Sequence, residues 1–447
     1  MWPLVGGWRW PHWMALWLVH VPMQVSSDSS SQPATTCKIA AKHQCLRACY
    51  PELLGFELRN SDVIGEIPSE EGDIDWDGKH TECICDWEQD FLQAFLQHCQ
   101  PKARTSVRVF SPGDHGAECY RIPVVTKTAH GSLLAFAEVR RGGCSDRRKV
   151  ELAVSRSEDH GKTWSPVEFA VGNRTHPVGN PWPMAMQSGS IAVAYVTDIL
   201  GSQRGNGNGI IFSEDDGVSW SAEVNISTEL GVAKASHPGP NAGVELTLPT
   251  GGKRLLIAGH AEDYKGTYIS YSDDAGKSWN TIPVAKAPLT GMTEPGLADL
   301  GNGELLLQMR HKREDAWGKG ISRSSDYGMT WSEVKFDAAL NGPVCQASIM
   351  AYGGSVYFAN TANDKKRSNM RIRRSDDGGR TWLPKTWLVQ KHPSMGYTSL
   401  VQGPLGPTED GRKSGILYES ITTGAIDFKI FPLDFASEAV EPSLFIA

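Results

Sequence analysis

The sequence lacks the features that mark nucleic-acid-binding and membrane-spanning proteins. Its 447 residues carry a net charge of −7, so there is no basic field to attract nucleic acid. No apolar run reaches the roughly 20 residues that a transmembrane helix needs. Beyond residue 110 there is no long amphipathic helical pattern, and alternating segments such as 131–137 and 254–258 predict short strands. We therefore expect the larger part of the chain to be all-β, without a nucleic-acid partner.

One short turn motif, Ser-x-Asp-x-Gly-x-(Ser/Thr)-Trp, occurs five times. Its tryptophans follow one another at intervals of 51 to 59 residues, which is the period of a four-stranded blade with its loops. In each copy Asp can accept backbone hydrogen bonds, Gly supplies a left-handed turn position and Trp buries a large ring. We interpret the copies as hairpin tips of a radially repeated scaffold, so the functional residues must lie elsewhere. The copies begin at Ser157, Ser213, Ser272, Ser324 and Ser375.

Residues 1–25 differ from the rest of the chain. They contain several tryptophans, a single Arg9 and the apolar run 14–19, a pattern typical of a secretory signal peptide or an N-terminal anchor. This leaves membrane attachment open. The acceptor sequences at Asn173 and Asn225 suit glycosylation in the secretory pathway. We expect a secreted or lumenal protein.

Residues 26–104 are predicted to form a small cysteine-rich module. Six of the nine cysteines fall here, in a segment too short for a large core, which favours a disulfide-stapled unit with two short helices, one of them at 86–99. The acidic stretch 66–77 is predicted to be a solvated loop. A zinc site is the alternative for Cys83 and Cys85, but their single intervening residue is shorter than zinc-knuckle spacing. The six cysteines are Cys37, Cys45, Cys49, Cys83, Cys85 and Cys99.

The segment 119–123, Cys-Tyr-Arg-Ile-Pro, lies before the first turn motif. In register with the five motifs it resembles the sialidase (exo-α-neuraminidase) superfamily, whose hallmark is a Tyr/Phe-Arg-Ile-Pro strand followed by repeated Asp boxes. The resemblance covers roughly residues 105–435. It implies a six-bladed β-propeller over residues 105–440 and hydrolysis of terminal sialic acids on glycoproteins, glycolipids or oligosaccharides. It implies neither a metal nor an organic cofactor.

Sialic acid carries a carboxylate on its anomeric carbon, and guanidinium groups grip two such oxygens in planar fashion better than lysine does. The family uses an arginine triad, and three positions match its patterns: Arg121 in Tyr-Arg-Ile-Pro, Arg310 and Arg367. Further arginines within 371–374 crowd the third position. Glu419 resembles the family glutamate that orients the first arginine.

The same carboxylate would repel an anionic nucleophile, whereas a neutral phenol that is deprotonated as it attacks avoids this repulsion. Sialidases use a tyrosine for this reason. By resemblance, Tyr397 is the nucleophile, Glu294 the base that activates it and Asp146 the acid/base in a mobile loop. The neighbouring Arg147 and Arg148 would lower the pKa of Asp146 unless they point away.

Three further expectations concern side chains near this group. The segment 180–184 resembles a loop that lines the pocket, where Trp182 either contacts the substrate or belongs to the core. Cys119 and Cys144 flank Arg121 and Asp146 and can form a disulfide, which would leave Cys345 unpaired.

We therefore predict a retaining exo-sialidase. A trans-sialidase, which transfers the sugar to a second sugar hydroxyl, is one alternative. A catalytically silent propeller that only binds sialic acid is the other, but such a protein would keep the arginines and lose the tyrosine, glutamate or aspartate.

Overall fold

The structure is a computed structural model that divides into two compact units, residues 1–104 and 105–447. We describe each unit by itself. In the first unit only strands 74–76, 79–84 and 100–103 are described, as backbone. In the second unit the structure describes residues 106–146, 150–172, 177–197, 207–230, 238–261, 266–284, 291–312, 317–406 and 412–435, and the backbone alone of 236–237.

The first unit contains a three-stranded antiparallel sheet in the order β1-β2-β3, formed by β1 (Ile74–Trp76), β2 (Lys79–Ile84) and β3 (Gln100–Ala103). The predicted solvated loop over 66–77 is therefore wrong at residues 74–76, which pair with β2. The predicted signal segment, the helix at 86–99 and the pairing of the six cysteines lie outside the described residues.

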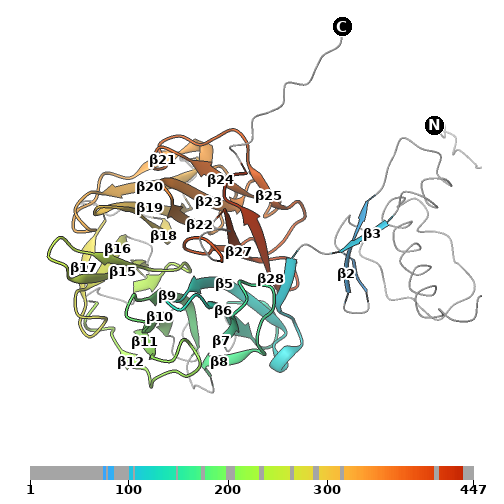
Figure 1. Ribbon diagram of the computed structural model, residues 1–447, viewed down its shortest axis with the longest axis horizontal. Coiled ribbons are helices and arrows are strands. Elements are labelled where there is room, and N and C mark those ends of the chain that lie inside the picture. Colours follow the sequence, from blue (N-terminus) through green and yellow to red (C-terminus); the bar gives the residue numbers. More distant parts are fainter. Residues whose placement is uncertain are drawn as a thin grey trace, which may run out of the picture. The chain divides into compact units, whose positions relative to one another are not determined.

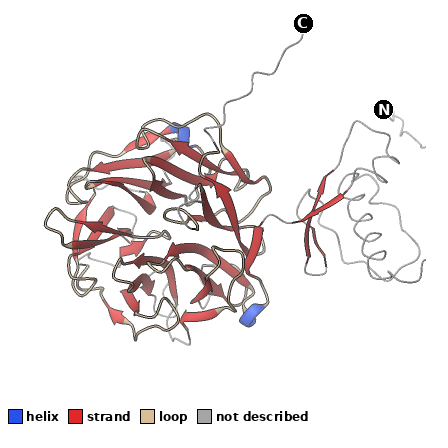
Figure 2. Cartoon of the chain, viewed as in Figure 1, coloured by secondary structure: helices blue, strands red, loops and turns tan. Residues whose placement is uncertain are grey.

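Six antiparallel sheets are arranged around a centre in the second unit, and strands make up nearly all of its regular structure (Figures 1 and 2). Inner strands of neighbouring sheets contact one another, for example β5 with β9, β18 with β22 and β26 with β5, so the ring is closed. The predicted six-bladed all-β propeller is confirmed. Among the described residues, no helix is long and apolar enough to cross a membrane.

The first three blades follow chain order. Blade 1 holds β5 (Cys119–Lys127), β6 (Leu133–Arg140), β7 (Val150–Ser157) and β8 (Glu168–Val171). Blade 2 holds β9 (Val178–Ala185), β10 (Ile191–Thr197), β11 (Gly207–Ser213) and β12 (Val224–Asn225). Blade 3 holds β13 (Ser236–Pro238), β14 (Val244–Thr247), β15 (Lys253–Ala261), β16 (Thr267–Ser272) and β17 (Asn280–Pro283).

The remaining strands form blades 4 to 6. Blade 4 holds β18 (Met292–Gly301), β19 (Glu304–His311), β20 (Lys319–Ser324) and β21 (Lys335–Asp337). Blade 5 holds β22 (Ser348–Tyr352), β23 (Ser355–Thr361), β24 (Met370–Ser375) and β25 (Trp387–Gln390). Blade 6 holds β26 (Thr398–Leu400), β27 (Lys413–Glu419), β28 (Ile426–Pro432) and β4 (Ser106–Phe110). Two short 3-10 helices, η3 (Asp114–Gly116) and η4 (Ala338–Leu340), lie in connections.

Blade 6 is completed by the first strand of the unit. Its order is β26-β27-β28-β4, and Phe110 of β4 lies opposite Ile426 of β28. The outermost strand of this blade therefore arrives from the other end of the propeller sequence. Because no hairpin links β28 to β4, blade 6 has no place for an Asp box, which explains why six blades carry five boxes.

Each Asp box links the third strand of its blade to the fourth. In the first box Ser157 Oγ donates to Asp159 Oδ1 at 2.9 Å, and that oxygen accepts from the Thr163 N–H at 2.8 Å. Ser157 Oγ also accepts from the Gly161 N–H at 2.8 Å. The same bonds recur in the other four boxes. In antiparallel blades these connections lie at the edge opposite to the start of each inner strand.

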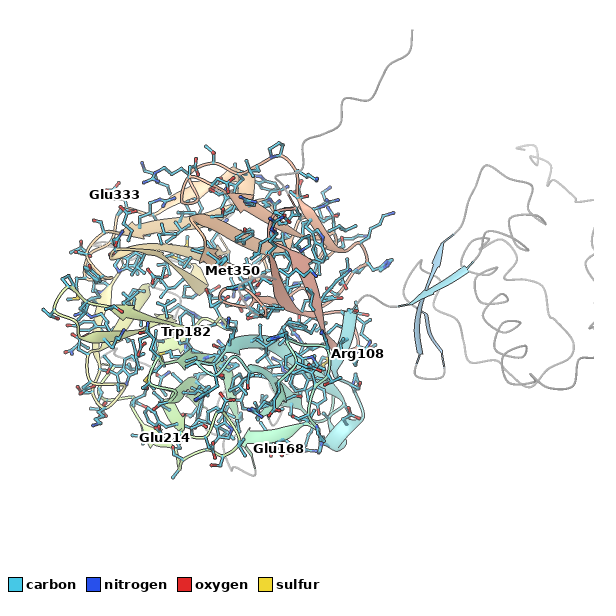
Figure 3. The ribbon with its side chains drawn as sticks, in the orientation of Figure 1. Arg108, Glu168, Trp182, Glu214, Glu333 and Met350 are labelled. Atoms are coloured by element: carbon cyan, nitrogen blue, oxygen red, sulfur yellow. A yellow bond between two sulfur atoms is a disulfide. The ribbon has the colours of Figure 1, made fainter. Side chains whose placement is uncertain are left out.

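The core lies between the blades. Trp182 and Met350 are buried and lie nearer the centre than Glu168, Glu214 and Glu333, which lie at the rim in Figure 3. The largest cluster joins side chains of blades 2, 3 and 4. The propeller therefore presents a rigid frame whose inner strand ends can carry precisely placed polar groups.

Candidate active site

The first arginine of the site lies near the start of β5. Arg121 is 6% exposed, and its Nε donates to Glu419 Oε1 at 2.7 Å. Glu419 ends β27 and is fully buried; Oε1 also accepts from the Ile122 N–H at 3.1 Å, while Oε2 accepts from the Tyr397 N–H at 2.8 Å. Burial lowers the pKa of Arg121, but Glu419 more than offsets this, so the net shift is upward and the guanidinium is charged. One carboxylate thus fixes an arginine of blade 1 and the backbone of a tyrosine before blade 6.

Three inner strands share a bulge at the edge where these residues lie. The strand register shifts between residues 121 and 124 in β5, between 179 and 182 in β9, and between 293 and 296 in β18. Within each bulge a residue other than glycine has a positive φ and precedes a proline: Ile122 at 56°, Asn180 at 51° and Glu294 at 40°. Such backbone is strained, and bulges change the direction of nearby side chains. The strain is therefore concentrated beside the predicted catalytic residues.

A tyrosine, a glutamate and an arginine form one hydrogen-bonded group. The Tyr397 hydroxyl donates to Glu294 Oε1. Arg310 Nη1, on β19, donates to Glu294 Oε2 at 2.6 Å and to the Tyr397 oxygen at 3.0 Å. Tyr397 is 5% exposed and precedes β26, so blades 4 and 6 bring together residues that are 103 positions apart.

The electrostatics around Tyr397 favour a neutral phenol. Burial, reinforced by Glu294, raises the pKa of Tyr397 well above 10.0, although Arg310 and Arg121 oppose the shift. The Cζ atoms of Arg121 and Arg367 lie 5.0 and 5.7 Å from the ring centroid, within the range of cation–π interaction. The hydroxyl therefore keeps its proton in the free site, with a carboxylate in place to accept it.

Arg367, the third arginine of the predicted triad, also lies over the Tyr397 ring. It lies in the connection between β23 and β24, where Nη1 donates to the Met395 carbonyl at 2.8 Å and Nη2 to the Val344 carbonyl at 3.3 Å. These bonds and its position over Tyr397 distinguish it from the arginines that follow. Those arginines bond to other residues: Arg371 to Thr386, Arg373 to Asn360 and Arg374 to Asp376.

Asp146 lies in the connection between β6 and β7, at the same edge of the propeller. Its side chain is 79% exposed, with Oδ1 2.5 Å from Arg140 Nη1 and 3.9 Å from Arg121 Nη1. Partial desolvation raises the pKa of Asp146, but Arg140 and Arg121 outweigh it, and the net shift is below 3.8. The pKa of Asp146 is therefore lowered by Arg140 and Arg121, which the sequence analysis did not connect with it. The predicted effect of Arg147 and Arg148 stays a prediction, because both lie outside the described residues.

Trp182 does not line the substrate pocket but belongs to the core, the second of the two alternatives for it. Its side chain is fully buried and packs in the core, and its indole N–H donates to the Leu256 carbonyl on β15 at 2.9 Å. The residue of this segment at the site edge is Asn180, whose backbone N–H donates to Glu138 Oε1 at 3.0 Å. The Asn180-Pro181 pair, like Glu294-Pro295, was the sequence signal for a strained inner-strand bulge.

Two buried groups lie close to the site: Lys319, which the sequence analysis missed, and Cys345, which it named only as an unpaired cysteine. Lys319, on β20, is 2% exposed, and its Nζ donates to the Cys345 carbonyl at 2.8 Å. Burial lowers its pKa to about 8. Cys345 is 1% exposed and clusters with Ile122 and Tyr397. The predicted disulfide Cys119–Cys144 is present, and Cys345 is the free cysteine among the residues that the structure describes.

Comparison with known proteins places the chain in a family. Residues 131–408 match the family model of the BNR repeat-like domain. The chain belongs to this family. Together with the six-bladed fold, the similar proteins confirm the predicted resemblance to the sialidase superfamily.

A curated sialidase of Bacteroides fragilis is 29% identical over 361 residues, which cover 71% of this BNR-repeat chain and 63% of the relative. The chain thus spans less than two thirds of that relative's length. Among solved structures, the Hadza microbial sialidase Hz136 is 26% identical with a TM-score of 0.64, covering 75% of this chain and 70% of the other. The leech intramolecular trans-sialidase shares the fold, with a TM-score of 0.63 at 16% identity, covering 79% and 73%.

Proposed function

We propose that this protein is a retaining exo-sialidase that hydrolyses α-linked terminal sialic acids of glycoproteins, glycolipids or oligosaccharides. The observation that carries the proposal is the Tyr397 hydroxyl held between Glu294 and Arg310, with Arg121 and Arg367 over its ring. A phenol bonded to a carboxylate suits nucleophilic catalysis, and clustered guanidinium groups suit an anionic substrate. The similarity to curated sialidases supports the same activity.

The arginines bind and orient the substrate. Arg121 and Arg310 are mostly buried and each is held by a glutamate, so their guanidinium planes are fixed before the substrate arrives. Fixed donors can bind the substrate carboxylate without paying the entropy of ordering flexible side chains. The triad thus sets the anomeric carbon beside the Tyr397 oxygen.

The first chemical step forms a bond between the Tyr397 oxygen and the anomeric carbon. The phenolic proton passes to Glu294, the glycosidic C–O bond breaks, and Asp146 donates a proton to the leaving oxygen. In the second step Asp146, now a carboxylate, takes a proton from water. That water attacks the anomeric carbon, the bond to Tyr397 breaks, and Glu294 returns the proton to the phenolate. The sugar leaves with its original anomeric configuration.

The low pKa of Asp146 in the free site needs a compensating change before it can act as an acid. Arg121, which helps to lower this pKa, also belongs to the carboxylate-binding triad. A bound substrate carboxylate adds negative charge beside Asp146 and so raises its pKa. The proton donor would thus form in the substrate complex, and we expect the reaction to favour acidic pH.

A silent binding protein fits the geometry less well. Binding a carboxylate needs the arginines, but it does not need a buried tyrosine bonded to a glutamate. Transfer to an acceptor sugar uses the same residues, and a trans-sialidase stays the alternative, because the leech structural neighbour is an intramolecular trans-sialidase complexed with 2,7-anhydro-Neu5Ac.

The decisive experiment incubates purified protein with a fluorogenic aryl sialoside and with sialyllactose, with and without added lactose. Release of free sialic acid, unchanged by lactose, is expected. Sialylated lactose formed from the aryl sialoside, or an anhydro sugar formed from either substrate, would replace hydrolysis by transfer. Tight binding of a planar unsaturated sialic-acid analogue without any turnover would favour the silent binder.

We further propose that the protein works in the secretory pathway or outside the cell. The Cys119–Cys144 disulfide supports an oxidising compartment, and Asn225, in one of the two acceptor sequences, is exposed at the end of β12. Peptide mapping of protein secreted from cells, before and after glycosidase treatment, tests this. Glycan-free protein retained in the cytosol would contradict it.

A further inference from the structure

The Cys119–Cys144 disulfide joins the strand that binds the substrate carboxylate to the loop that carries the proton donor. Cys119 begins β5 and lies two residues before Arg121; Cys144 lies two residues before Asp146. Cys119 pairs with Arg140, the last residue of β6, at the open end of the β5–β6 hairpin. The disulfide therefore joins the start of β5 to the loop that follows β6.

The strand side of the disulfide is firmly placed. Cys119 is fully buried. The next residue, Tyr120, donates its N–H to the Gly424 carbonyl at 2.8 Å. A Cβ on Gly424 would come within 2.1 Å of the Cys119 sulfur, so the connection from β27 to β28 packs directly on it. Cys119 is thus anchored by two blades.

The loop side of the disulfide has a backbone with large conformational freedom. Gly142 and Gly143 both have positive φ, at 80° and 106°, and glycine pairs leave a chain with large conformational freedom. The side chain of Asp146 is 79% exposed. Arg140 Nη1 donates to the Cys144 carbonyl at 2.6 Å and to Asp146 Oδ1 at 2.5 Å, and Arg121 Nη1 lies 3.9 Å from the same Asp146 oxygen. At the start of the loop, Arg141 donates to Glu151 and to the His115 carbonyl. The disulfide at Cys144 adds a covalent anchor to these polar contacts.

We propose that the Cys119–Cys144 disulfide is a positioning device for the proton donor: it holds the Asp146 carboxyl within reach of the leaving oxygen. The inference rests on the proposed function. A general acid must lie within hydrogen-bond reach of the atom it protonates, and a loop that samples many positions loses that contact. The disulfide would therefore assist departure of the leaving group. It would not affect binding of the substrate carboxylate, because the arginines bind that group.

The need for acid catalysis depends on the leaving group, and this gives the test. An aryl sialoside expels a stable phenolate and needs little proton donation, whereas sialyllactose expels an alkoxide and needs it strongly. For the Cys119→Ala/Cys144→Ala variant we expect kcat/KM, which reports the step in which the leaving group departs, to fall about tenfold or more on sialyllactose and to change by less than about threefold on the aryl sialoside. The affinity for the planar analogue should not change.

A second variant keeps the crosslink and separates positioning from stability. Insertion of two glycines after Ser145 leaves the disulfide intact but lengthens its connection to Asp146. The same selective loss on sialyllactose is expected. The matched control is Asp215→Ala, which breaks an Asp box at the opposite edge and should lower the melting temperature without a leaving-group dependence.

The possible outcomes distinguish failure of this inference from failure of the proposed acid role of Asp146. Asp146→Ala should show the selective loss at its largest, and removing the cysteines in that background should add nothing further. If Asp146→Ala shows the selective loss but neither loop variant does, the disulfide is only structural and the inference fails alone. If Asp146→Ala lowers kcat/KM equally for both substrates, the acid role of Asp146 fails and the inference fails with it.

Discussion

The two edges of the propeller are built by different rules. At the Asp-box edge five near-identical turns use hydrogen bonds between residues at most four positions apart, and the Asp residues are exposed or half-buried. At the other edge, Arg121 bonds to a glutamate 298 positions away and Tyr397 to one 103 positions away. The repeated edge is encoded locally and stabilises each blade by itself. The catalytic edge exists only when the ring is closed.

The difference extends to backbone strain. In the Asp boxes the positive φ falls at the same turn position in all five copies, as at His160 and Ala275. At the catalytic edge it occurs in the inner-strand bulges of three blades, at Ile122, Asn180 and Glu294. The strain in the Asp boxes is a property of the turn, because it recurs at the same turn position. The strain in the inner-strand bulges lies outside this repeated position and occurs beside the site.

The largest expected effect comes from removing the one hydroxyl on which the catalytic edge is centred. Tyr397→Phe should lower kcat on sialyllactose by about a thousandfold or more, because the nucleophilic oxygen is lost while the arginines stay. Affinity for the planar analogue should stay within about tenfold. A fluorinated sialoside should label the wild-type protein at Tyr397 and leave the variant unlabelled, as read by mass spectrometry. Turnover retained in full by the variant would overturn the assignment.

The next effect tests the arginine triad. Arg310→Lys should weaken binding of substrate and planar analogue together, by about 1.5–3 kcal/mol, because a point charge replaces a planar fork. It also removes the bonds from Arg310 to Glu294 and Tyr397. Arg323→Lys, on the Asp-box side of blade 4, is the matched control and should leave binding unchanged. An unaltered Michaelis constant and analogue affinity for Arg310→Lys would exclude it from the triad.

A third effect concerns pH. The pKa of buried Lys319 is lowered from 10.5 to about 8, first by burial and then by Arg310 and Arg373, against the opposing Cys345 and Glu294. Between these pH values the unfolded chain holds a proton that the folded chain has lost, so stability should rise with pH, by about 1 kcal/mol per unit. Urea unfolding from pH 8 to 10.5 measures this rise, which Lys319→Met should abolish. An equal rise in the variant would assign it to another group.

The sequence predicted the Asp-box edge more completely than the catalytic edge. The five boxes predicted the blades because each box is a local pattern with its own turn chemistry. The triad, Tyr397 and Glu294 were found through resemblance to a family, and the structure brings them together. Their hydrogen bonds could not be read from spacing, because they join separate blades.

The errors at the catalytic edge have physical reasons. Trp182 and Asn180 are two residues apart on β9, and a bulge decides which of them lies at the site edge and which in the core. Arg140 is the last residue of β6, and every residue of this strand is buried. No sequence motif distinguishes Arg140 from an arginine with a purely structural role. Lys319 carries no motif at all; its importance follows only from burial beside the site.

The smallest expected effect lies at the Asp-box edge and uses a pair of matched positions. Ala275 in the third box and Gly378 in the fifth occupy the same turn position, with φ of 61° and 71°. This conformation strains a side-chain-bearing residue but not glycine, so Ala275→Gly should stabilise the protein by about 0.5–1 kcal/mol after the entropic cost of glycine, and Gly378→Ala should destabilise it similarly. A Cβ on Gly378 would meet no atom closer than 3.3 Å, so a clash would not confuse the result.

Urea midpoints measure both changes, and kcat should stay constant, since neither position touches the catalytic edge. A loss of stability on Ala275→Gly would mean that the hydrogen bonds of the box, and not its backbone strain, decide the residue at this position.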